Sequence, residues 1–244
     1  MSTLPDQLCL PLRLPERGAF ERFVADANAE VIAALRHWAT TPIACHLLLH
    51  GESGSGKSHL LHAACQAALA AGFTVRFVQL DLPGLEPSVL DDTEHCDAIA
   101  IDALHAVAGR RDWELALFNL YNAQHQRQGR LLFAARAPAP ALGLVLPDLS
   151  SRLTACATYA VVPLDDAGRA ALLQREAAAR GLVLDAPTLR YILTFSPRDV
   201  ASLLALLDAL DRATLALRRA PTPRLVGKLL QRNLDDGGGN DPAV

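Results

Sequence analysis

The part of the sequence best suited to chemistry is GESGSGKS at residues 51–58, which matches the phosphate-binding motif G-x-x-x-x-G-K-[ST] at every constrained position. In such a loop, successive backbone N–H groups point at phosphate oxygens, and the helix that follows adds its partial positive charge. The motif predicts that Lys57 reaches the β- and γ-phosphates of a nucleotide and that Ser58 ligates Mg²⁺. The residues predicted to bind the nucleotide are Gly51, Glu52, Ser53, Gly54, Ser55, Gly56, Lys57, Ser58 and His59.

The residues around the motif have the pattern that a phosphate loop requires. An apolar run of strand length occupies residues 45–50, and a helical pattern follows at residues 59–71. The alternative interpretation is a glycine-rich turn that matches the motif by chance. Such a turn would need neither a strand before it nor a helix after it.

A carboxylate suited to the metal ion ends a second apolar run, AIAID at residues 98–102. We predict that Asp102 holds Mg²⁺ together with Ser58, although an aspartate here can also serve only to cap the next turn. Ala103 comes next, where many nucleotide-hydrolysing proteins carry a second acid that polarises the attacking water. Hydrolysis in the site of this chain should therefore be slow.

Apolar runs without strict alternation predict the strands that position these residues, because parallel strands are buried on both faces. The predicted strands are residues 46–50, 75–80, 98–102, 130–135 and 158–163. Their alternation with helical segments predicts an α/β fold with a parallel sheet. Beyond residue 163 the strand pattern stops, and a small all-α domain is predicted. Its predicted helices are residues 166–180, 187–195 and 198–217.

Composition limits the remaining possibilities. A chain of 244 residues with 51% hydrophobic content can bury one large core and a small second one. The net charge of −3 argues against non-specific DNA binding as the main activity, so DNA should be met through partners. The five cysteines form no C-x-x-C pair, which argues against a zinc site or a disulfide framework. Without an export signal or a long apolar run, we expect a cytoplasmic protein with no membrane partner.

Several segments taken together resemble the Hda family, short relatives of the replication initiator DnaA in the AAA+ superfamily. Besides the two nucleotide motifs, the segments that carry the resemblance are QLCLPL (7–12), PDLSSRL (147–153) and SPRDVASLLALLDALDRA (196–213). The resemblance implies an AAA+ P-loop NTPase core followed by a helical lid, with ADP or ATP and Mg²⁺ as ligands. The domains it implies are a flexible tail (1–18), a nucleotide-binding α/β domain (19–163), a lid (164–234) and a disordered tail (235–244).

The same resemblance assigns roles to two arginines. Arg152 matches the arginine finger of the family, which implies that it acts in trans on the nucleotide of a neighbouring subunit. The alternative is an ion pair with Asp148 at i−4, which would have little functional effect. Arg198 resembles the sensor-2 arginine, which implies that it reaches from the lid to the phosphates of bound nucleotide. Its alternative is a solvated residue at the start of a helix.

The N-terminal residues resemble the part of the family that meets a DNA-bound partner. The hexamer QLCLPL looks like a sliding-clamp-binding peptide, although taken alone such a peptide more often packs as a strand on its own domain. Its predicted contact residues are Gln7, Leu8, Leu10, Pro11 and Leu12. Residues 20–35 resemble the base-contacting entry region, with Phe23 and Asn28 as candidates. Core packing explains Phe23 about equally well.

The chain also departs from the family pattern. Residues 134–136 are Ala, Ala and Arg, where many AAA+ ATPases end the strand with a polar sensor-1 residue. With Ala103, this change removes two groups that would align water on the nucleotide of this chain. No C-terminal helix-turn-helix domain follows the lid, so specific recognition of double-stranded DNA is not expected.

The resemblance implies a negative regulator of replication initiation that docks on the DNA polymerase III sliding clamp and stimulates ATP hydrolysis by DnaA. A self-acting AAA+ ATPase, of the helicase-loader or remodeller type, is one alternative. A clamp adaptor in which nucleotide is vestigial is another. A small-molecule kinase fits less well, because the C-terminal region is leucine-rich rather than an arginine-rich lid. Whether the chain forms a homodimer stays open.

Overall fold

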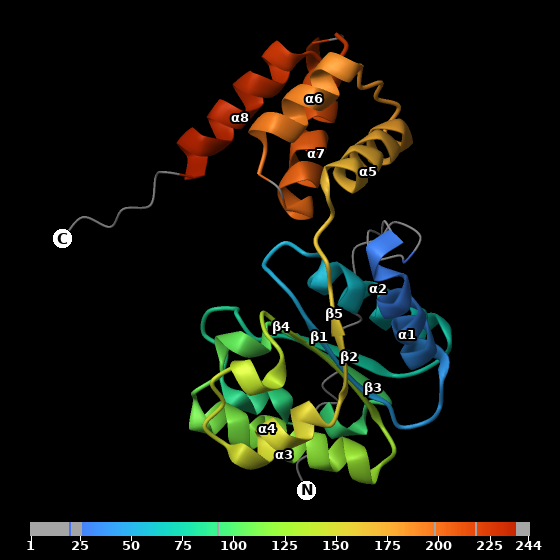
Figure 1. Cartoon of the computed structure of the whole chain (residues 1–244), viewed down its shortest axis with the longest axis vertical. Coiled ribbons are helices and arrows are strands. Elements are labelled where there is room, and N and C mark those ends of the chain that lie inside the picture. The colour runs from blue at the N-terminus through green and yellow to red at the C-terminus, as the bar shows by residue number, and fades with distance from the viewer. Residues whose placement is uncertain (1–19, 21–25, 92, 198, 218, 238–244) are drawn as a thin grey trace, which may run out of the picture.

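The structure, a computed structural model, consists of an α/β core and a separate bundle of helices (Figure 1). The residues that it describes are 20, 26–91, 93–197, 199–217 and 219–237. Within these ranges, no helix combines the length and the apolar character needed to cross a lipid bilayer.

The core is built on a five-stranded parallel sheet with the strand order β2-β3-β4-β1-β5. Its strands are β1 (His46–His50), β2 (Val75–Gln79), β3 (Ala98–Asp102), β4 (Arg130–Ala135) and β5 (Ala157–Ala160). The predictions for β1, β3 and β4 are confirmed to the residue. In a parallel sheet the carboxyl ends of all strands meet at one edge, so the phosphate motif after β1 and Asp102 at the end of β3 lie at the same edge.

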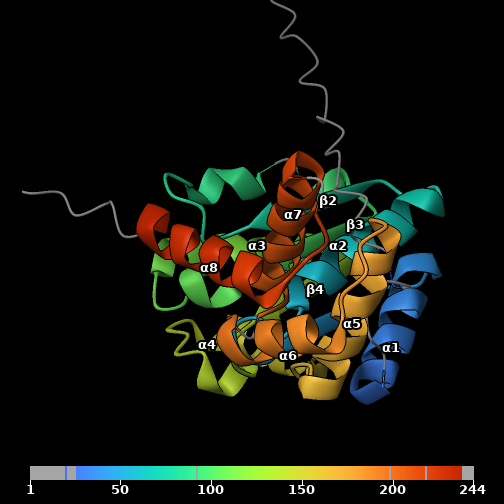
Figure 2. The same cartoon turned by 90° about the horizontal axis from the view of Figure 1, so that it is seen from above.

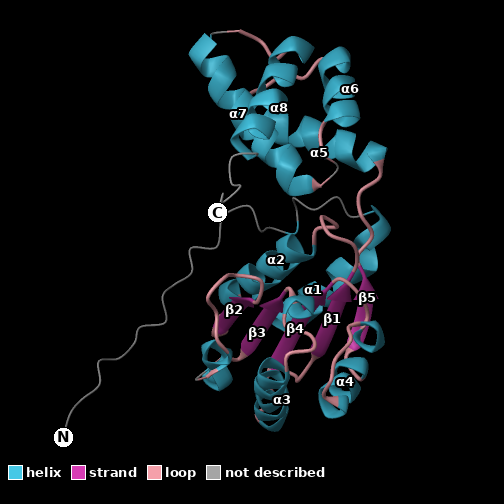
Figure 3. Cartoon of the chain, turned by 90° about the vertical axis from the view of Figure 1, so that its left-hand side faces the viewer, coloured by secondary structure: helices cyan, strands magenta, loops and turns pink. Residues whose placement is uncertain are grey.

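Helices cover both faces of this sheet (Figure 3). On one face lie α1 (Ala29–Thr40) and α2 (Lys57–Ala70), and on the other lie α3 (Arg111–Gln126) and α4 (Pro147–Thr154). Successive side chains of a strand point to opposite faces, so Leu47 and Leu49 pack in one cluster and Leu48 in the other. Both clusters are apolar, which explains why the strand sequences show no alternation.

Strand β5 ends at Ala160, three residues before the predicted end at 163. The N–H of Val161 still donates to the carbonyl of His50 at 2.7 Å. The backbone of Val162 bonds instead to the side chain of Asn28, which donates to its carbonyl and accepts from its N–H, both at 2.9 Å. The side chain of Asn28, which is far away in the sequence, thus replaces the hydrogen bonds of a neighbouring strand at Val162.

The lid contains four helices around one apolar cluster (Figure 2). They are α5 (Asp166–Ala179), α6 (Ala186–Phe195), α7 (Val200–Leu217) and α8 (Pro223–Gly237). The sequence predicted the first three. Helix α8 was not predicted because Gly227 is a helix-breaking signal within it, whereas Pro223 at its first position is compatible with a helix start. The helix continues past the predicted lid boundary at 234. Gly227 has a packing reason, since a Cβ there would lie 2.9 Å from the hydroxyl of Tyr191.

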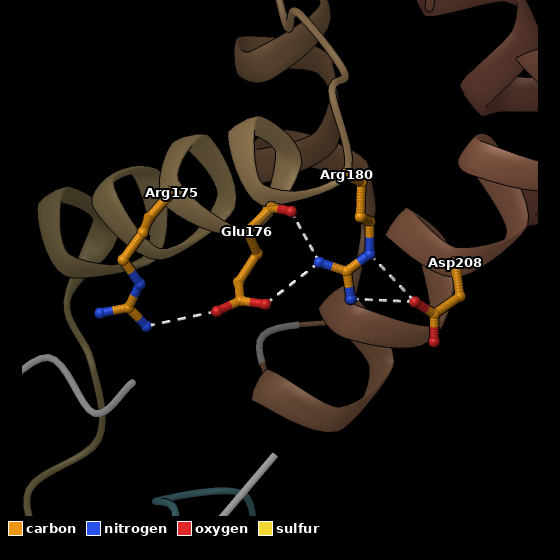
Figure 4. A network of polar contacts seen from close by, with 4 residues as sticks. All are labelled: Arg175, Glu176, Arg180 and Asp208. Atoms are coloured by element: carbon orange, nitrogen blue, oxygen red, sulfur yellow. Dashed lines mark hydrogen bonds and ion pairs between the residues drawn. The ribbon is translucent and has the colours of Figure 1, made fainter. Parts of the chain in front are cut away.

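An ion-pair network ties the end of α5 to α7 (Figure 4). The Arg180 guanidinium donates to Glu176 Oε2 at 3.1 Å and to Asp208 Oδ1 at 2.9 Å. Burial lowers the pKa of Arg180, but the hydrogen bonds and charges of Glu176 and Asp208 outweigh burial and raise it above its ordinary value. The network therefore fixes the packing of two lid helices.

Candidate functional site

The phosphate-binding motif forms the turn between β1 and α2, and close approach requires glycine at two of its positions. Gly51 has φ 156° and Gly54 has φ 77°. A Cβ at Gly51 would lie 2.5 Å from the carbonyl oxygen of Val161, and one at Gly54 would lie 2.7 Å from the Cβ of Asp199. The loop is therefore held between the end of the sheet and the start of the lid helix α7.

The loop has the geometry of a phosphate cradle. Gly56 adopts a left-handed conformation with φ 98°, and α2 begins at the next residue without a side-chain cap. The N–H groups of a first helical turn have no partner within the helix, so they can donate to an anion. Ser58 is exposed in this turn, so its hydroxyl group is accessible to a metal ion. The residues present thus fit a nucleotide phosphate.

Lys57 is the nearly buried cation of this loop, with 8% of its surface exposed. Its Nζ donates to the carbonyls of Gly51 at 2.8 Å and Glu52 at 2.6 Å, and to Ser55 Oγ at 3.2 Å. Burial lowers the pKa of Lys57, the Asp102 carboxylate opposes this effect, and the positive charge of Arg136 adds to it. An anion in the loop would offset the cost of burying the charge of Lys57 and the repulsion between Lys57 and Arg136, so the site favours phosphate.

Asp102 lies where a metal ligand was predicted, at the carboxyl end of β3 with 5% of its surface exposed. Its Oδ1 accepts the N–H of Ala103 at 2.7 Å. The phosphate loop follows β1 at the same edge of the sheet, so Asp102 and Lys57 belong to one site, and the carboxylate acts against the effect of burial on the pKa of Lys57. Ala103 has a left-handed backbone with φ 56°, and its methyl group offers no base for water. The chemistry of Ser58 and Asp102 fits Mg²⁺, whose ligands are oxygen atoms.

Arg136 is a charged residue at the position that the sequence marked as a departure. His50 of β1 pairs with Ala135 of β4, so Arg136 is the first residue past the sheet beside the phosphate loop. It is exposed, and its charge lowers the pKa of Lys57 and, after burial, that of His105. The edge of the sheet therefore carries a second positive charge next to the loop.

A cavity of about 610 Å³ is lined by both the loop and the lid. Glu52 and Gly54 line it from the loop, and Arg169 and Asp199 line it from the lid. Arg169 is nearly buried and pairs with Asp166 in the first turn of α5. A nucleotide bound at the loop would touch both parts of the chain.

Arg152 lies on α4, exposed, beside a second cavity of about 410 Å³. Its guanidinium carbon lies 5.8 Å from the centre of the Tyr121 ring. Among the described residues, no ion pair joins Arg152 to Asp148, which was the alternative suggested by their spacing.

Arg152 and the phosphate loop lie at opposite ends of β1. His46, the first residue of β1, contacts the Tyr121 ring that lies under Arg152, whereas the loop follows His50 at the other end. Five residues of strand span roughly 17 Å. Figures 1 and 3 show α4 and α2 on opposite faces of the sheet. The structure therefore does not bring Arg152 into the site that holds Lys57.

No signal in the sequence indicated the role of Glu114, and the sequence suggested a role for Asn28 that the structure does not support. Glu114 is fully buried and accepts the N–H groups of Gly109 at 2.8 Å, Val145 at 3.1 Å and Leu146 at 2.6 Å, which holds the start of α4. A glutamate within a helical pattern gives no signal of such a role. Asn28 was a candidate for base contact, but it is 1% exposed and bonded to Val162, so it is not available to a base.

Three predicted features lie outside the described residues. They are the clamp-binding peptide with Gln7, Leu8, Leu10, Pro11 and Leu12, the sensor-2 candidate Arg198, and the base-contact candidate Phe23.

Comparisons with known proteins agree with this architecture. Domain III of the replication initiation protein DnaA from Thermotoga maritima matches with a TM-score of 0.75 and 16% identity, over 89% of this chain and 97% of that one. AMPPCP-bound DnaA from Aquifex aeolicus matches with a TM-score of 0.65 and 19% identity, over 81% of this chain and 66% of that one. The Thermotoga maritima RuvB Holliday junction branch migration motor matches with a TM-score of 0.66 and 17% identity, over 89% of this chain and 72% of that one.

The lid matches a family directly in sequence. Residues 166–230, which include α5, α6 and α7, match the family model described as "Hda, lid domain". The structural matches show that the chain shares the fold of these proteins over 81–89% of its length, and the family match identifies the type of lid formed by residues 166–230. The chain therefore has the fold of DnaA domain III, and its helical domain is similar to the lid of the Hda family.

Proposed function

We propose that this chain is a negative regulator of chromosomal replication initiation that stimulates ATP hydrolysis by DnaA. In this proposal, Arg152 enters the nucleotide site of ATP-bound DnaA, while residues 7–12 dock on the DNA polymerase III sliding clamp loaded on DNA. The observation that carries the proposal is the place of Arg152, which is exposed at the end of β1 remote from the chain's own phosphate loop. An arginine there is available to a neighbour and not to its own nucleotide.

The chemistry proposed for Arg152 is electrostatic. Its guanidinium stabilises the negative charge that develops on the γ-phosphoryl group during transfer to water, an effect worth about 10³ to 10⁵ in rate. Docking on the clamp raises the effective concentration of the arginine near DnaA, so stimulation is confined to DNA that carries a clamp. DNA is then met only indirectly.

In the chain's own site we propose ADP, or slowly hydrolysed ATP, as a ligand that sets the position of the lid. The N–H groups at the start of α2, together with Lys57, would hold the phosphates, and Ser58 and Asp102 would hold Mg²⁺. When bound there, Mg²⁺ would neutralise part of the negative charge of the phosphates. Arg198 would add a contact from the lid. Ala103 and Ala135 offer no side chain that positions water, which supports slow turnover.

The test is a reconstitution with DnaA, ATP, loaded clamp and DNA. Arg152→Ala should lower the stimulated rate of ATP hydrolysis by about 10³ while clamp binding stays intact. Arg110→Ala is the matched control, since Arg110 is also exposed and lies 5.7 Å over an aromatic ring, that of Trp113. Equal stimulation by the wild type and Arg152→Ala would refute the proposed role.

A self-acting AAA+ ATPase is the second candidate, and the complete set of Lys57, Ser58 and Asp102 at one edge of the sheet favours it. Turnover by the isolated chain above about 1 s⁻¹, abolished by Lys57→Ala, would establish this function instead. Normal regulation by Lys57→Ala would favour a clamp adaptor that does not need nucleotide.

A further inference from the structure

The Arg152 side chain has an aromatic partner within its own chain. The guanidinium carbon lies 5.8 Å from the centre of the Tyr121 ring, within the range of a cation–π contact. Tyr121 is on α3 and is only 5% exposed, whereas Arg152 on α4 is exposed. A fixed ring thus lies beneath a long, charged side chain.

Tyr121 is itself held from several sides. The His46 ring packs against it at 4.8 Å between centres, and the His125 ring stacks on it at 6.2 Å. Next to this ring, the Sγ of Cys156 donates to the carbonyl oxygen of Arg152 at 3.4 Å. The histidine rings therefore hold the Tyr121 ring in place beneath the Arg152 guanidinium.

The alternative partner of Arg152 is Asp148, one helical turn earlier and on the same cavity. An ion pair with Asp148 would occupy N–H donors of the guanidinium, whereas contact with a ring face leaves all five free for phosphate oxygens. Among the described residues, Arg152 makes the ring contact and no ion pair. We infer that Tyr121 is a positioning residue that holds the Arg152 guanidinium extended and unpaired for the triphosphate of a partner subunit.

This inference rests on the proposed function, but its first test does not. In full-length protein with labelled arginine, the ring current of Tyr121 should shift the Arg152 side-chain resonances upfield in NMR spectra. The shift should persist in Tyr121→Phe, which keeps the ring, and disappear in Tyr121→Leu. Tyr159→Leu, the same change at a half-buried tyrosine in the other core cluster, should leave it unchanged. A wild-type resonance without a ring-current shift would overturn the inference.

The second test measures stimulation of DnaA by the same variants. Tyr121→Leu should lower the stimulated rate roughly three- to tenfold, with Tyr121→Phe and Tyr159→Leu near the wild type. In the Arg152→Ala background, Tyr121→Leu should have no further effect, because its action passes through the arginine. A loss of the same size in both backgrounds, or no loss in Tyr121→Leu, would overturn the positioning role. If Arg152→Ala itself has no effect while the NMR shift is present, the proposed function fails and the contact stands.

Discussion

The carboxylate of Glu114 on α3 accepts the N–H of Leu146, the N-cap residue of α4, at 2.6 Å. This bond connects a fully buried charge to the helix that carries Arg152. The position of the arginine thus depends on a side chain more than thirty residues before it in the sequence.

Replacing Glu114 by glutamine should destabilise the fold. The new amide group turns one acceptor into a donor that faces backbone N–H groups, leaving buried donors unpaired, and about 2–3 kcal/mol of unfolding free energy should be lost. Chemical denaturation measures this. Glu86→Gln, at an exposed glutamate without a side-chain capping bond, should change stability by less than about 0.5 kcal/mol. Equal effects of the two variants would contradict the role of Glu114.

Replacing Gly54 by alanine should weaken nucleotide binding. Gly54 and Gly84 both have φ 77°, so alanine at either position should cost about 1–2 kcal/mol in backbone strain. Only at Gly54 does the new Cβ also meet Asp199, while nothing lies within 4 Å at Gly84. We expect calorimetry to show binding weaker by about tenfold or more for Gly54→Ala and unchanged for Gly84→Ala. Unchanged binding by both variants would show that the loop and lid can separate freely.

Protonation of His46 should make the fold less stable in mild acid. Burial, with the charge of His125 as the second cause, lowers the pKa of His46 from 6.5 to about 4, and its buried ring nitrogens have no hydrogen-bond partner within the part of the chain that the structure describes. The unfolded chain therefore binds a proton that the folded chain does not between pH 6.5 and about 4. Stability should fall as the pH drops through this window, and it should fall less in His46→Leu. Parallel pH profiles of unfolding would contradict this assignment.

The effect of Gly227→Ala on the free energy of unfolding should depend on the residue at position 191. Alanine favours a helix over glycine by about 1 kcal/mol, but its Cβ would lie 2.9 Å from the hydroxyl of Tyr191. Gly227→Ala should therefore give no gain in the wild type and a gain of about 1 kcal/mol in Tyr191→Phe. Thermal unfolding of the four proteins gives the coupling. A gain in both backgrounds would show that Tyr191 moves aside without cost.

The core could be read from the sequence because its signals are local. Buried parallel strands are continuous apolar runs, and the motif at residues 51–58 is recognised from the spacing of its own residues. The end of β5 could not be read, since Asn28 bonds to Val162 across 134 positions. Helix α8 could not be predicted, because a glycine usually signals a helix break, whereas Gly227 leaves room for the hydroxyl of Tyr191 inside the helix.

The site was predictable to the same extent. Lys57, Ser58 and Asp102 belong to local motifs, and the structure places them at one edge of the sheet. The partners of Arg152 did not follow from the sequence, because its spacing from Asp148 suggested an ion pair while a ring on another helix makes the contact. Contacts between helices depend on how they pack, which single-residue patterns do not encode.

Because Arg152 and the phosphate loop lie apart, the molecule has two different surfaces, one with the arginine and one with the nucleotide site. A contact in which the arginine of one subunit meets the nucleotide of another joins unlike surfaces, so it has no twofold symmetry. Repeating it builds a row with two different ends rather than a closed pair. If the proposed function holds, a subunit at one end of such a row would donate an arginine without receiving one, and it would act on a neighbour while its own nucleotide stays intact.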